Sequence, residues 1–244
     1  MATHAVPALP HTLRVPTTPG TQAVRWVGSR LVAVPVLTPR PAPEERFGPP
    51  VWDPSGEAWY RQANGTIVRV EPGGGQTVVV DDVQGIDIDV RTWAGVAVSR
   101  EPNDAIVLHR FVGDRTVLAR GKGLAAPRLS PDGTRVLVTE SRRSGGHVLV
   151  LAPGRAPVDL GPGHGPAWMP DGRVILARPV HDGHRVTAST LHVIDPGSGL
   201  ESRLPDTPGI APVRPTVSDD GCRLAFVDAV TGVVHTARMP SLEP

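Results

Sequence analysis

The residues best suited to chemistry in this chain of 244 residues are three histidines in two neighbouring loops. His164 lies in the glycine-rich stretch 161–165, and His181 and His184 lie in the loop 178–185. Three imidazoles that meet could ligate Zn²⁺ or a similar divalent ion and leave one coordination position open. One of them could equally act as a general base. Because a His-x-x-His spacing on a loop lacks the fixed geometry of a helix, solvated loop histidines are the alternative.

Two further loops carry clustered charges. Arg100 and Glu101 follow one aliphatic run, and Glu140, Arg142 and Arg143 follow another. Loops that project from a rigid scaffold are common sites of binding. We therefore predict that these five residues form a partner-binding surface, with solvated turns as the alternative.

Composition and motifs exclude several classes of protein. The net charge of +1 argues against binding of a phosphate backbone by bulk electrostatics, so no nucleic-acid partner is expected. The single cysteine, Cys222, excludes an internal disulfide. No nucleophile elbow, P-loop or dinucleotide fingerprint is present. No apolar run approaches the roughly 18 to 20 residues that span a bilayer. Residues 1–20 lack the pattern of a signal peptide, which indicates a cytoplasmic protein, and a trimmed secreted protein is the alternative.

The elements that must position these side chains repeat along the chain. The clearest copy, 126–138, is a proline-led strand, the turn Pro131-Asp132-Gly133 and an aliphatic strand. Further copies lie at 49–59, 165–176 and 214–226. Proline presets φ and Asp-Gly favours a tight turn, so each copy predicts two antiparallel strands. Starts roughly 40 residues apart are typical of a propeller built from four-stranded blades.

The fourth repeat shows the whole unit, with strands expected near 125–129, 135–140, 147–151 and 157–160. Helical periodicity is absent, so we predict an all-β chain in which residues 1–244 form a single β-propeller domain. Trp168 aligns with two other tryptophans of the repeats and is predicted to pack between blades.

The predicted ring has six blades, of which the first is incomplete. The proline-rich loop 38–48 leaves little room for the outer strands of that blade, and five blades plus an extra hairpin is the alternative count. A strand near 11–15, within the N-terminal segment 1–20, is expected to pair into the last blade. Such pairing would close the ring and remove an exposed edge.

The phrase Ser130-Pro131-Asp132-Gly133, followed by aliphatic strands, resembles the TolB-like group of β-propellers, including the WD40-like PD40 repeat. The resemblance covers most of residues 20–240. It implies a ring of six or seven blades and, most often, a platform for partners. The motif itself specifies a turn and carries no chemistry, so it implies a fold rather than an activity.

In this architecture the first strand of each blade lines a central channel. The aligned repeats place Arg25, Asp89 and Arg128 at one channel-facing position, and Asp87 and Arg214 two residues earlier. Such a channel could bind a small anion or zwitterion through bidentate guanidinium contacts. The alternative is a wet channel whose charges pair with one another.

Two functions follow from these observations. The leading hypothesis is a non-catalytic binding module without a cofactor, which holds a protein partner or a small anionic ligand on its loop rim and channel mouth. The alternative is a small-molecule enzyme of the lyase, lactonase or cyclase type, with a site at the channel mouth and a divalent metal such as Zn²⁺. Heavy use of Ala, Arg, Gly, Pro and Val indicates a GC-rich bacterial genome, in which natural-product metabolism is one setting for such an enzyme.

Overall fold

The computed structural model describes residues 23–27, 30–34, 51–52, 58–83, 87–91, 94–143 and 145–239. The regular elements in these ranges are β-strands in antiparallel sheets, which confirms the prediction of an all-β chain. Within the same ranges, no helix has the length and apolar character that a bilayer span requires.

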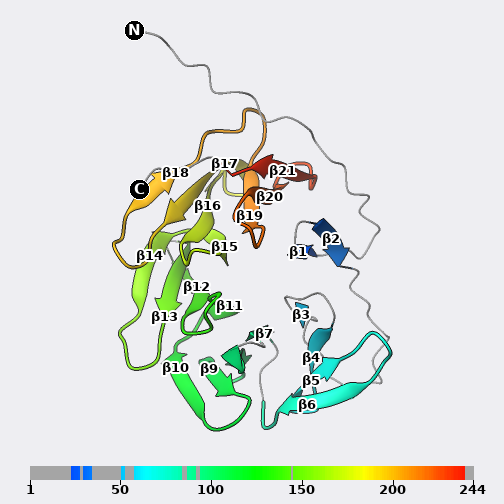
Figure 1. Ribbon diagram of the computed structural model, residues 1–244. Helices are drawn as coiled ribbons and strands as arrows, with labels where there is room; N and C mark the ends of the chain where they lie inside the picture. The colour runs from blue at the N-terminus through cyan, green and yellow to red at the C-terminus, as the bar shows by residue number, and fades with distance from the viewer. Residues whose placement is uncertain are drawn as a thin grey trace.

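The strands form six sheets, which Figure 1 shows arranged around a common centre. The two-stranded sheet consists of β1 (Ala23–Val27) and β2 (Arg30–Val34). The first four-stranded blade consists of β3 (Val51–Trp52), β4 (Trp59–Ala63), β5 (Thr66–Val70) and β6 (Gln76–Val80). The next consists of β7 (Asp87–Arg91), β8 (Val96–Glu101), β9 (Ala105–Arg110) and β10 (Arg115–Arg120).

The later blades follow the same order. One consists of β11 (Leu124–Leu129), β12 (Val136–Arg142), β13 (Gly145–Leu151) and β14 (Val158–Pro162). The next consists of β15 (His164–Trp168), β16 (Val174–His181), β17 (Val186–Ile194) and β18 (Glu201–Arg203). The last is three-stranded, with β19 (Pro212–Val217), β20 (Arg223–Asp228) and β21 (Val234–Arg238).

Each blade is a meander in which the first strand lies nearest the centre and the last lies outside (Figure 1). The four strands predicted for the fourth repeat agree with β11–β14 to within two residues at each end. The proline-rich loop 38–48 and the expected closing strand near 11–15 lie outside the described residues, so the blade count and the mode of closure stay predictions.

The core consists of aliphatic layers between neighbouring blades. Val136 and Val138 pack against the β7–β10 blade, whereas the intervening Leu137 packs against the β15–β18 blade. Because both faces of a blade are covered, its middle strands are aliphatic at successive positions instead of alternating with polar residues. Full burial of one such side chain contributes about 1.5–3 kcal/mol.

The Pro-Asp-Gly turn joins one blade to the next. The Asp132 carboxylate accepts hydrogen bonds from the backbone N–H and the hydroxyl of Thr134, and Ser130 Oγ accepts one from the N–H of Arg135. Gly133 has a φ of +73°, and a Cβ there would lie 2.6 Å from the Cβ of Ala94 in the neighbouring blade. The turn therefore needs glycine both for its backbone conformation and for the close approach of two blades.

Strand β11 is also held by hydrogen bonds from both neighbouring blades. From one side, Asp89 accepts from the N–H of Leu129 at 2.8 Å, and Arg91 donates to the carbonyl of Leu129 at 2.7 Å. From the other side, Trp168 Nε1 donates to the carbonyl of Arg128 at 2.9 Å. Trp168 is buried among residues of two blades, which confirms the predicted inter-blade packing.

Three inner strands share a β-bulge at the residue that precedes their proline. Ala126, Gly165 and Arg214 have φ values of +52°, +56° and +51°, and the register of β11, β15 and β19 shifts at these positions. In β7 the pairing with β8 is regular. Because a bulge breaks the period-two alternation of side chains, a simple alignment of the repeats cannot assign which inner-strand residues share a face.

Candidate binding rim

The candidate site lies where two blades present their middle hairpins, β12–β13 and β16–β17, beside the connection from β14 to β15. In an antiparallel meander these connections lie at one end of the blade, and the Pro-Asp-Gly turns lie at the other. The N–H of Gly163 donates to the carbonyl of Gly146 at 2.9 Å, which ties the connection to the β12–β13 hairpin. We call this surface the arginine–histidine rim; its members are Glu140, Arg142, Arg143, His147, Asp159, His164 and His181.

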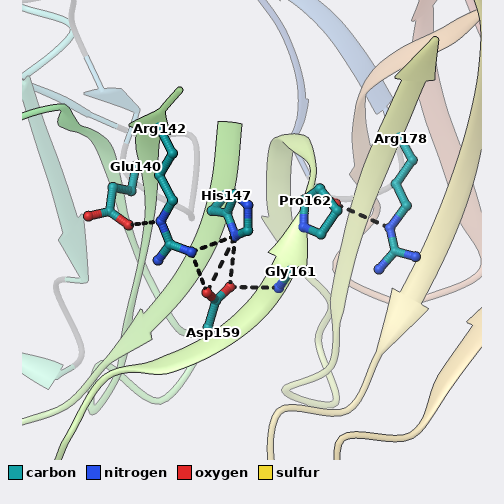
Figure 2. Close-up of polar contacts among 7 residues, drawn as sticks. All are labelled: Glu140, Arg142, His147, Asp159, Gly161, Pro162 and Arg178. Atoms are coloured by element: carbon teal, nitrogen blue, oxygen red, sulfur yellow. Dashed lines mark hydrogen bonds and ion pairs between the residues drawn. The ribbon is translucent and has the colours of Figure 1, made fainter. Parts of the chain in front are cut away.

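Arg142 is the centre of a polar network that spans three strands (Figure 2). Its Nη1 donates to Asp159 at 2.7 Å and lies 2.8 Å from Nδ1 of His147, while its Nε donates to Glu140. Asp159 also accepts from the N–H of Gly161 at 2.7 Å. The network therefore fixes the position of one guanidinium at the end of the blade.

The hydrogen bonds of this network shift the pKa values of its members. Bonds to Asp159 and Glu140 raise the pKa of Arg142 above its ordinary value. Burial raises the pKa of Asp159, but the N–H of Gly161 and the side chains of Arg142 and His147 outweigh it, so the net pKa is lowered. Both groups therefore stay charged over the physiological range. The neighbouring Arg143 is exposed and has no hydrogen bond or ion pair with any described residue.

His164 and His181 form the second part of the rim. Their ring centroids lie 6.3 Å apart at an angle of 62°. The His164 ring lies over Gly146, where a Cβ would be 2.9 Å from its Cε1. Burial, and then the proximity of His181, lower the pKa of His164. His164 is therefore a neutral imidazole at neutral pH, able to accept or donate one hydrogen bond.

His184, the third histidine of the predicted metal site, lies in an exposed turn. Its N–H donates to Asp182 at 2.9 Å. In the described parts of the chain, no group of three or more His, Cys, Asp or Glu side chains is arranged to hold a metal ion. The structure thus brings together two of the three predicted ligands, and the zinc site stays a prediction.

A further ion-pair cluster joins the rim to the next blade. Arg178 donates to the carbonyl of Pro162 at 3.1 Å (Figure 2) and to Glu201 at 2.8 Å. Glu201 also lies 2.6 Å from Nδ1 of His192, whose pKa is lowered by burial and then by Arg178. This cluster, like the roles of His147 and Asp159, is not predictable from the sequence, because the register of the outer strands determines which side chains meet.

The four predicted channel residues whose side chains are described have different partners. Asp87 pairs with Arg100 at 3.2 Å. Asp89 is only 3% exposed, and its carboxylate accepts hydrogen bonds from the N–H of Leu129 and from the guanidinium of Arg91. Arg128 is exposed and donates to the carbonyl of Pro127.

Arg214 and Arg25 complete that set. Arg214 is exposed, and its Cα would lie 3.0 Å from a Cβ at Gly165, so its strand packs beside the start of β15 and hence beside His164. The Arg214 guanidinium has no hydrogen bond to another described residue. Arg25 is placed on β1 opposite Val32, and its side chain lies outside what is described. Binding of an anion in the channel stays a prediction, with Arg128 and Arg214 as its exposed members.

Two members of the predicted partner-binding surface, Arg100 and Glu101, belong to the β7–β10 blade. Glu101, at the end of β8, is 3% exposed, and both its carboxylate oxygens lie 2.9 Å from Nη2 of Arg115. Arg100 pairs with Asp87 as described above. The position of Glu101 near a loop was predictable from the sequence, but its ion pair with Arg115 on β10 was not.

Comparisons with known proteins show the fold. No protein-family model matches the chain, and no curated protein matches it significantly. The structure of a putative TolB from Agrobacterium tumefaciens has a TM-score of 0.56 at 14% identity, over 80% of this chain and 91% of that one. TolB from Acinetobacter baumannii has a TM-score of 0.51 at 23% identity, over 81% of this chain and 54% of that one. The structure of a nidogen/laminin complex has a TM-score of 0.54 at 17% identity, over 83% of this chain and 81% of that one.

These similarities agree with the meander sheets around a common centre and with the repeated Pro-Asp-Gly turn. The chain therefore has the fold of a TolB-like β-propeller.

Proposed function

We propose that this protein is a non-catalytic binding module that holds a protein partner on the arginine–histidine rim. The observation that carries the proposal is the preorganised Arg142 network beside the exposed Arg143. Three strands fix the first guanidinium, and the Gly146–Gly163 bond fixes the hairpin that presents both arginines. A surface whose polar groups are already ordered loses less conformational entropy when it binds.

The charge of the rim indicates the chemistry of the partner. Glu140 and Asp159 compensate Arg142, whereas Arg143, and Arg214 beside Gly165, have no such acidic partner among the described residues. An acidic segment of a protein would supply the missing carboxylates, and a small carboxylate ligand at the channel mouth is the narrower version of the same proposal. The similar fold in the nidogen/laminin structure occurs in a complex of two proteins, which supports a binding role.

The test is capture of partners from a lysate of the source organism, followed by titration of each purified candidate. Wild type is compared with Arg142→Ala/Arg143→Ala on the rim and with Arg238→Ala at the opposite end of a blade, where the arginine is exposed. We expect a partner that binds wild type and the Arg238 variant equally and binds the rim variant at least tenfold more weakly. Equal affinity for all three proteins would contradict a rim site.

The His164–His181 pair favours one second function, a small-molecule enzyme at the channel mouth. A general base must be unprotonated, and burial and the neighbouring His181 lower the pKa of His164, which favours its neutral form. Here His164→Gln should abolish turnover of a substrate found by screening, and unchanged turnover would contradict the enzyme.

A further inference from the structure

A groove of about 480 Å³ lies between the β7–β10 and β11–β14 blades, at the end opposite to the arginine–histidine rim. It is lined by the Asp132–Gly133 turn, by the end of β9 and by the turn that follows β13. Turns after the first and third strands of a blade share one end, so these segments meet there by topology.

The walls of this groove are held in place. Gly133 approaches Ala94 so closely that no side chain fits between them, and Asp132 is bonded to Ser130 and Thr134. Ala152 and the exposed Pro153 form the accessible apolar part of the lining, above the core residues Val96 and Leu108. The groove is therefore a built feature of the blade contact, with an accessible apolar surface.

Three arginines line the groove, and one of them, Arg135, already contacts other residues of the fold. Arg135 lies with its guanidinium carbon 4.9 Å from the centroid of the Trp168 ring and donates to the carbonyl of Gly172 at 3.4 Å. Arg110 and Arg155 are exposed, and neither guanidinium has a hydrogen bond or ion pair with another residue that the structure describes.

The groove consequently has an excess of positive charge. Asp132 is the one carboxylate among its described lining residues, and that carboxylate already accepts three hydrogen bonds. We propose that the groove binds a small organic anion, whose apolar body packs on Ala152 and Pro153 and whose phosphate or carboxylate accepts from Arg110 and Arg155. Guanidinium groups suit both anions because their planar N–H donors match two oxygens at once.

The test is titration with naphthyl phosphate, monitored by calorimetry on the full chain. Naphthol, which lacks the anion, and inorganic phosphate, which lacks the apolar body, are titrated in parallel. We expect saturable one-to-one binding of naphthyl phosphate and affinities for the other two that are at least about tenfold lower. Equal affinity for inorganic phosphate would contradict the apolar half of the proposal, and equal affinity for naphthol would contradict the anionic half.

Substitutions of arginines inside and outside the groove test where the anion binds. Arg110→Gln/Arg155→Gln should weaken binding by about tenfold or more, while Arg120→Gln, an exposed arginine at the other end of β10, should leave it unchanged. Circular dichroism checks that each variant is folded, which is expected because both groove arginines are exposed. Unchanged binding in the double variant, equal loss in the Arg120 variant, or no binding by wild type would overturn the proposal. None of these outcomes bears on the rim, which lies at the opposite end of the blades.

Discussion

The two ends of the β11–β14 blade use polar side chains in opposite ways. At the turn end, Ser130 and Asp132 bond to the backbone and side chains of their own turn, and Gly133 docks on the neighbouring blade. At the rim end, Arg142, His147 and Asp159 bond mainly to one another. The comparison indicates that the turn end stabilises the ring, whereas the rim end positions charged groups at its surface.

The largest effect is expected from the turn glycine. Gly133→Ala should lower the free energy of unfolding by roughly 3 kcal/mol, because it adds strain at a φ of +73° and a Cβ at 2.6 Å from Ala94. Gly154→Ala is the matched control, since Gly154 has a φ of +69° but no atom within 4 Å of the added Cβ. It should cost about 1 kcal/mol. Urea unfolding of both variants measures the difference; equal losses would show that inter-blade docking at Gly133 contributes nothing.

A second prediction concerns a histidine in the middle of a blade instead of at its rim. Burial, then the charge of Arg115, lower the pKa of His109 from 6.5 to about 4, while Asp82 opposes this shift. Between those pH values the unfolded chain binds a proton that the folded chain does not, so stability is full above pH 6.5 and falls as the pH drops toward 4. The loss should reach about 3 kcal/mol by pH 4.

The variant His109→Gln separates this contribution from those of other groups. Glutamine keeps a partner for Ser99 Oγ, which lies 2.8 Å from Nε2 of His109, but does not titrate. The difference in unfolding free energy between wild type and variant should therefore shrink as the pH falls from 6.5 to 4. A constant difference across that range would mean that His109 titrates normally in the fold.

The third prediction compares an aspartate at each end of the blade. Asp132→Ala should cost about 1 kcal/mol, because the Thr134 N–H and two hydroxyls lose their acceptor. Asp159→Ala should cost less than about 0.5 kcal/mol, because Arg142 keeps Glu140 and stays in contact with solvent. Thermal unfolding of both variants gives the order; a larger loss at Asp159 would reverse the roles assigned to the two ends.

The smallest effect is expected from metal. With two histidines in contact and His184 elsewhere, zinc or a chelator should change the melting temperature of the purified protein by less than about 1 °C. Elemental analysis provides the direct check. Retained metal that is lost in His181→Ala/His184→Ala would instead establish the zinc site and favour the enzyme.

Sequence patterns were sufficient for the parts of the fold that depend on local chemistry. The Pro131-Asp132-Gly133 phrase predicted a turn between aliphatic strands, and β11–β14 lie where it placed them. Trp168 was predictable for the same reason, since its position in the repeat fixes the face that it presents to the preceding blade.

The site was less predictable because it depends on strand register and on backbone irregularity. Arg142 was found from its loop, but its partners His147 and Asp159 lie on two other strands and meet it only through the pairing of β13 with β12 and β14. The bulges in β11, β15 and β19 likewise interrupt the alternation of side chains between the two faces of a strand, and the predicted set of channel residues depended on that alternation. Strand register leaves no local mark in the sequence, whereas a proline follows each of the three bulges and marks its position.

The hydrogen bonds that β11 makes with both neighbouring blades have a consequence for folding during synthesis on the ribosome. Asp89 and Arg91 precede β11 in the chain, so they can capture Leu129 as soon as it emerges from the exit tunnel. The Trp168 bond to the carbonyl of Arg128 must wait for about 40 further residues, which take a few seconds to translate. Strand β11 can therefore attach first to the blade made before it, and the blade made after it completes the attachment.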